Sequence, residues 1–153
     1  MPADQKGLLY MAQECDFYET AEVPPGSNKG PRVSEILRLA HSTPGQPWCA
    51  AVVYVCYIHL AKCSTRRPLY PASVASWIQW AKAYGKLRKA PKRGYLFFLQ
   101  GEGRSHIGAV VRVRGDIVET LEGNTNDAGQ REGVRMARRE RRIASIDGYI
   151  DMS

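Results

Sequence analysis

A cysteine and a histidine offer this chain a nucleophile and a base. Cys49 begins an apolar run, CAAVVYVCYIHLAKC, directly after a turn-rich stretch that contains Gly45 and Pro47. If the run is a helix, the thiol lies in its first turn, where the helix dipole and the N–H groups favour the thiolate. The same N–H groups can stabilise an oxyanion. The position indicates a cysteine nucleophile, although a cysteine on an apolar helix is more often a core residue.

His106 is the histidine best placed to act as the base. It follows the glycine-containing segment QGEGRS and opens the stretch HIGAVV, whose β-branched residues predict a strand. A base must lie within hydrogen-bond reach of the thiol, and such partners meet only in the folded chain. His59 falls in the middle of the predicted helix, which indicates a structural role.

A base of this kind needs a third group to orient its ring. The segment LEGNTN supplies Glu122 and Asn124, which share one face of a strand. The hairpin turn falls around residues 114–116. A three-residue loop there would place His106 opposite Asn124 and diagonal to Glu122. A two-residue loop would place them on opposite faces unless a bulge intervenes, and EGNTN alone also reads as a simple turn.

The elements that must position these residues fall into two groups along the chain. Apolar periodicity predicts a short helix near residues 8–12 and longer helices over 31–40, 48–63 and 73–85, with Gly85 as a C-cap. Short runs rich in β-branched and aromatic residues predict strands over 95–99, 106–113, 116–122, 134–138 and 148–150. Helices followed by antiparallel strands indicate an α+β fold.

Length and composition favour one domain, spanning residues 1–153. The hydrophobic share of 44% is enough for a core without metal or disulfide support. Four cysteines occur, and the last three are seven residues apart. On a helix that spacing is a rise of about 10.5 Å, whereas a disulfide needs Cα atoms within about 7 Å. We therefore expect free thiols.

The net charge of +7 favours anionic partners, which include nucleic acid, acidic membranes and the bacterial cell wall. Several of the arginines gather near the C-terminus, and a solvated basic face is the plain alternative. The N-terminal apolar stretch is too short for a signal-peptide core, and the longest apolar run is too short to cross a bilayer. We expect synthesis in the cytoplasm without a signal peptide and no membrane insertion.

Several segments taken together resemble the CHAP family, the cysteine, histidine-dependent amidohydrolases and peptidases of the papain-like superfamily. They are NKGPRV, PWCAAVVYVCY, HIGAVV, ETLEGNTN, REGV and GYI, from about residue 28 to residue 150. The resemblance implies a papain-like fold, with N-terminal helices packed on a C-terminal antiparallel sheet. It also implies roles: Cys49 as nucleophile, His106 as base, Glu122 as the group that orients the imidazole, and Asn124 as a further polar residue of the site.

Many members of that family act in phage lysins or in wall remodelling, so the implied substrate is peptidoglycan. The bond would be the N-acetylmuramoyl-L-alanine amide or a peptide bond of the stem or cross-link. Gln46 and Trp48 are candidate substrate contacts, with a core position as the alternative for Trp48. Some members bind calcium through an acidic N-terminal loop. Because CDFYETAEVPPGSN has only scattered acids, we expect no metal and no cofactor.

Other functions remain open at this stage. The same cleft would serve a secreted antibacterial amidase effector or another cysteine protease, and analysis of digested peptidoglycan would separate these. A basic, non-catalytic nucleic-acid-binding protein is the rival from another class, and its binding would weaken steeply with salt. The sequence shows no recognised nucleic-acid motif, so we expect no specific nucleic acid as partner. We expect a monomer that acts on the wall after release or delivery.

Overall fold

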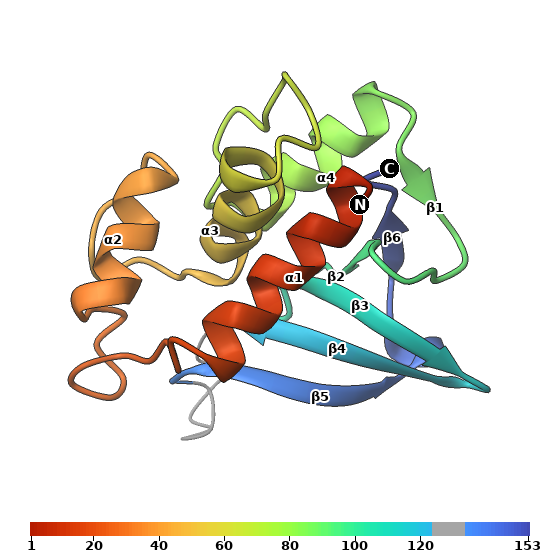
Figure 1. Ribbon diagram of the computed structural model, residues 1–153. Coiled ribbons are helices and arrows are strands. Elements are labelled where there is room, and N and C mark those ends of the chain that lie inside the picture. The colour runs from red at the N-terminus through yellow and green to blue at the C-terminus, as the bar shows by residue number, and fades with distance from the viewer. Residues whose placement is uncertain (124–133) are drawn as a thin grey trace.

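In the part of the chain that the structure describes, four α-helices and a six-stranded antiparallel sheet make up the fold (Figure 1). The computed structural model describes residues 1–123 and 134–153. The helices lie together on one side of the sheet, as the figure shows. They are α1 (Ala3–Asp16), α2 (Pro31–Leu39), α3 (Cys49–Val53) and α4 (Val74–Ala83). The predicted α+β class, with N-terminal helices on a C-terminal antiparallel sheet, is confirmed.

The helix predicted from the apolar run starts at Cys49. It begins as α3, with Trp48 as N-cap, and continues without a break into the π-helix η1 (Tyr54–Leu60). Every side chain of α3 is buried, which explains why the run carries almost no polar residue. The consequence for the site is that Cys49 occupies the first turn, as the sequence predicted.

The strands lie in the order β1-β6-β2-β3-β4-β5. Four of the five predicted strands match closely, whereas β5 extends beyond residue 138. The two-residue β1 was not predicted, because it is too short to show a pattern. The bounds are β1 (Leu87–Arg88), β2 (Leu96–Leu99), β3 (His106–Arg114), β4 (Ile117–Gly123), β5 (Met136–Arg142) and β6 (Gly148–Ile150), with the 3-10 turn η2 (Ile143–Ser145) before β6.

The two faces of the sheet differ in what covers them. On one face, side chains such as Phe98, Ile107 and Leu121 pack with the helices in the main core. On the other, Phe97, Val110, Val118 and Tyr149 form a smaller cluster. The helix α1, which precedes the segments that resemble the CHAP family, is longer than predicted and packs against η1 and strands β3 to β5.

The β3–β4 hairpin settles the register question that the sequence left open. Arg114 pairs with Ile117, so the loop has two residues, Gly115 and Asp116. The register then shifts between Val110 and Arg112, which marks a bulge on β3. This is the bulge that a two-residue loop requires if His106 and Glu122 are to share a face.

The described residues contain no helix long and apolar enough to cross a membrane. The four cysteines all lie in the described part of the chain, and none of them forms a disulfide there.

Candidate active site

Cys49, His106 and Glu122 meet at one end of the sheet, brought there by α3, β3 and β4. Nε2 of His106 lies 2.8 Å from Oε1 of Glu122. The His106 ring also forms a hydrogen bond with Cys49. Because Nε2 faces the carboxylate, Nδ1 is the nitrogen left for the thiol. The three residues are 4%, 3% and 0% exposed, so the contacts are shielded from bulk solvent.

Glu122 is held by two further residues that the sequence analysis did not assign to the site. Oε2 accepts hydrogen bonds from Oγ1 of Thr120 at 2.6 Å and from Nε of Arg141 at 2.7 Å. Oε1 accepts from Nη2 of Arg141 at 2.7 Å, in addition to its contact with His106. Each carboxylate oxygen therefore has two partners. Thr120 was detectable in principle, since it lies two residues before Glu122 on the same strand face; Arg141 lies on β5 and gave no such signal.

The contacts change the pKa of both titratable partners. Burial lowers the pKa of His106, but the hydrogen bonds and negative charges of Cys49 and Glu122 outweigh it and raise this pKa to about 10. Burial raises the pKa of Glu122, but the hydrogen bonds and positive charges of Arg141 and His106 outweigh it and lower the value. At neutral pH the site thus holds an imidazolium and a carboxylate.

The other cysteines sit in surroundings that favour the neutral thiol. Burial raises the pKa of Cys63 to about 12 and holds the pKa of Cys56 well above its usual range. The pKa of Cys15 is also raised, mainly by burial and by the charge of Asp16. Cys49 is the cysteine in hydrogen-bond contact with a cationic ring, which is the setting of a reactive thiolate.

Two glycines allow the elements of the site to approach each other closely. A Cβ on Gly123 would lie 2.6 Å from Cγ1 of Val52 and 3.0 Å from the indole ring of Trp48, so glycine lets the start of α3 rest on β4. A Cβ on Gly108 would lie 2.6 Å from Cε1 of Phe97 and 3.0 Å from Cγ of Glu122. Both positions require the absence of a side chain.

The other residues that the sequence suggested for the site are Trp48, Asn124 and Gln46. Trp48 is fully buried and donates from Nε1 to Oε2 of Glu22 at 2.9 Å, so its assignment as a substrate contact was wrong and its alternative, a core position, is correct. The indole must satisfy its N–H in the core, and Glu22 supplies the acceptor. Asn124 lies outside the described residues.

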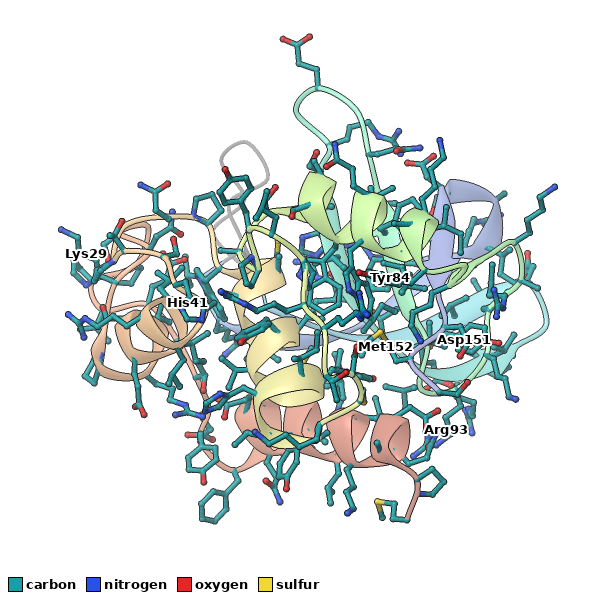
Figure 2. The ribbon with its side chains drawn as sticks, turned by 90° about the horizontal axis from the view of Figure 1, so that it is seen from above. Lys29, His41, Tyr84, Arg93, Asp151 and Met152 are labelled. Atoms are coloured by element: carbon teal, nitrogen blue, oxygen red, sulfur yellow. The ribbon has the colours of Figure 1, made fainter. Side chains whose placement is uncertain are left out.

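Gln46 lies on the wall of a cleft beside the start of α3. The cleft has a volume of about 440 Å³ and is lined by residues 40–42, 46–47, 67 and 69–73. Its wall carries basic and uncharged polar side chains, His41, Ser42, Gln46, Arg67 and Ser73, and apolar ones that include Leu69 and Tyr70. Figure 2 shows His41 beside α2 and α3. Gln46 and Pro47 precede Cys49 by three and two residues, so the cleft adjoins the site along the chain.

Comparison with known families agrees with this geometry. A model of the CHAP domain matches residues 41–124, more than half of the chain, and the match includes Cys49, His106 and Glu122. The chain belongs to the CHAP family. CHAP domains are typically amidases and peptidases associated with peptidoglycan, and the papain-like architecture found here is the one the family resemblance implied. No curated protein and no solved structure matches the chain.

Residues 1–123 and 134–153 contain no group of three or more His, Cys, Asp or Glu side chains that could hold a metal ion. Cys49, His106 and Glu122 at the CHAP site are residue types suited to nucleophilic and acid–base chemistry.

Proposed function

We propose that this CHAP protein hydrolyses an amide bond of peptidoglycan with Cys49 as the nucleophile. The observation that carries the proposal is the buried row in which Cys49 contacts the His106 ring and Glu122 holds the opposite nitrogen of that ring. This is the arrangement of nucleophile, base and orienting group that amide hydrolysis uses.

In the first half of the reaction the Cys49 thiolate attacks the carbonyl carbon of the amide. A C–S bond forms and the carbonyl oxygen becomes an oxyanion, for which the N–H groups of the first turn of α3 are the nearest source of donors. The C–N bond then breaks while the His106 imidazolium gives its proton to the leaving nitrogen. The amine departs and a thioester on Cys49 remains.

In the second half the neutral His106 ring takes a proton from water. The hydroxide equivalent attacks the thioester, the C–S bond breaks, and the carboxylic acid product leaves. The thiolate and the imidazolium are then restored. Glu122 stays ionised throughout, and its contact with Nε2 keeps Nδ1 directed at the sulfur.

The cleft beside α3 is the site that we assign to the peptide of the substrate. It mixes apolar side chains with polar groups, which is typical of peptide-binding surfaces. Its wall includes Arg67 and His41 and no carboxylate among the residues that form it, so it suits a peptide that carries acidic groups. Gln46 on this wall takes the role of a substrate contact.

The experiment that tests the proposal is digestion of purified peptidoglycan, followed by mass spectrometry of the released fragments. We expect new amino and carboxyl ends at one type of amide bond, and their masses name that bond. Cys49→Ala should release none of these fragments. Glycan fragments without newly cut amides, or equal release by Cys49→Ala, would contradict the proposal.

An antibacterial effector is the second candidate, since the same site would serve it. It differs in its target, and activity against the peptidoglycan of foreign but not of related bacteria would favour it.

A further inference from the structure

We propose that Arg141 is a positioning residue of this site, which fixes the carboxylate of Glu122 and thereby the ring of His106. The inference rests on the proposed function and deepens it. Arg141 lies on β5, beyond the residues that the CHAP comparison matches, so neither the family match nor the sequence motifs assign it a role.

The contact between Arg141 and Glu122 is a two-point clamp. Nε and Nη2 of the guanidinium each donate to a different carboxylate oxygen at 2.7 Å. A planar fork facing a planar carboxylate fixes the plane of the carboxylate, which a single donor cannot do. Since Oε1 is also the atom that contacts His106, the orientation of the fork is transmitted to the imidazole.

Arg141 is itself held in place. Its guanidinium lies over the ring of Phe97, 5.2 Å from the ring centre, and the same ring lies 6.1 Å from the ring of His106. The side chain of Arg141 is only 18% exposed, whereas Glu122 is fully buried. Gly108 leaves the space that Phe97 and Glu122 occupy. The clamp is thus part of a packed cluster and not a surface ion pair, whose contribution would be small.

The clamp also sets the charge balance of the site. Facing the His106–Glu122 pair are Cys49 from α3 and Arg141 from β5, and from β2 and β4 the uncharged Phe97 and Thr120. Without Arg141, His106 would be the one positive group among the described residues that contacts the buried Glu122. The carboxyl would be easier to protonate, and the imidazolium and thiolate would lose support as pH falls.

The test compares two variants. Arg141→Met removes both the two-point hydrogen bonding of the guanidinium and its charge. Arg141→Lys keeps the charge but not the two-point hydrogen bonding. Both variants should lower kcat about ten- to a hundredfold, the range seen when residues that orient catalytic ligands are lost, with KM nearly unchanged. Arg142→Met is the matched control, because Arg142 is the exposed next residue of β5 and points to the other face. It should keep the activity of the parent protein.

A second readout separates positioning from a loss of folded protein. The rate at which iodoacetamide alkylates Cys49, followed on the Cys49 peptide by mass spectrometry, reports the thiolate against pH without any substrate. Removal of a positive charge disfavours the thiolate, so the acid limb should move to higher pH in Arg141→Met and stay in place in Arg141→Lys. Unfolded protein would add a separate limb near the ordinary thiol pKa of about 8.5, so the folded fraction of each variant is measured first by circular dichroism.

Two results would overturn the role of Arg141. In the first, both variants keep kcat within about twofold of the parent protein. In the second, kcat falls in Arg141→Met while the acid limb of Cys49 alkylation stays at the pH of the parent. The role of Arg141 is supported if kcat falls in both variants and the limb moves in Arg141→Met alone. Cys49→Ala in the same assay distinguishes the two proposals: activity that persists in Cys49→Ala contradicts the proposed function, whatever Arg141 does.

Discussion

In the proposed mechanism, charges of alternating sign follow one another through the buried site from the Cys49 thiolate to the Arg141 guanidinium. Between them lie the imidazolium of His106 and the carboxylate of Glu122, in direct contact with their neighbours. Each charge is tolerable in the interior because the next one compensates it. A row of this kind keeps the sulfur nucleophilic at neutral pH without exposing it to solvent.

The raised pKa of His106 predicts the pH range of activity. Since this pKa is about 10, the imidazolium persists to about pH 10, and the alkaline fall of kcat/KM on a soluble wall fragment should begin only near that pH. Alkylation of Cys49 should not fall there, because the thiolate remains. A pH–rate profile and an alkylation profile on the same protein check both. A fall of kcat/KM near pH 6.5, the ordinary pKa of histidine, would contradict the contacts of His106.

Stability should follow the same ionisation. A raised pKa means that protonated His106 contributes stability that is complete below the ordinary value of 6.5 and is lost as pH rises toward 10.

Among the elements, α3 and the β3–β4 hairpin decide whether sulfur and imidazole meet. The helix places Cys49, and the bulge near Val111 places His106 and Glu122 on one face. Their contact depends on how closely α3 rests on β4, where Gly123 faces Val52 and Trp48.

Gly123→Ala tests this dependence. The added Cβ would lie 2.6 Å from Val52, so α3 must shift away from β4, at a cost of about 1–3 kcal/mol typical of overpacked sites. We expect lower thermal stability and a larger relative loss of kcat, because Cys49 moves with α3. Unchanged stability and kcat would show that the close approach is not needed.

Arg67 on the wall of the cleft beside α3 gives another prediction. Arg67→Gln should reduce kcat/KM for a peptide with a free carboxylate about three- to tenfold, and much less for the same peptide as an amide. Arg66→Gln is the control, since Arg66 donates to the Tyr84 hydroxyl at 3.0 Å and does not line the cleft. Equal effects of Arg67→Gln on the acid and the amide would place the acidic groups of the substrate elsewhere.

The local hydrophobic pattern of the sequence predicted most of these helices and strands. The features that it missed depend on contacts between segments far apart in the sequence. The helix at Cys49 and the strands at His106 and Glu122 carry strong periodicity, so they were predicted from sequence. The roles of Cys49, His106 and Glu122 came from the CHAP resemblance and stay predictions. Arg141 could not be found, because its link to Glu122 crosses from β5 to β4. Trp48 was misplaced because an indole beside a candidate nucleophile reads equally as cleft or core.

At the scale of the whole molecule, the net charge of +7 bears on how the protein reaches its substrate. Part of the positive charge is compensated by local pairs, such as Arg138 with Asp16 and Arg114 with Glu140. The excess attracts polyanions over a Debye length, about 10 Å at 0.1 M salt.

Hydrolysis of intact walls should therefore decline as salt rises, whereas hydrolysis of a small uncharged fragment should change little. Turbidity of a wall suspension and chromatography of the fragment measure the two. Equal salt dependence would assign the effect to the catalytic site itself. Tight, salt-sensitive nucleic-acid binding by a protein that leaves both substrates intact would favour the rival function.

The catalytic roles of Cys49 and His106 are tested by the hydrolysis of purified peptidoglycan by Cys49→Ala and His106→Ala, with Cys56→Ala as the control thiol. Cys56 lies on the continuation of the same helix, and its pKa is raised well above the ordinary value by burial. We expect loss of new amide ends in the first two variants and retention in the third. Amide ends released at the parent rate by both Cys49→Ala and His106→Ala would contradict the account.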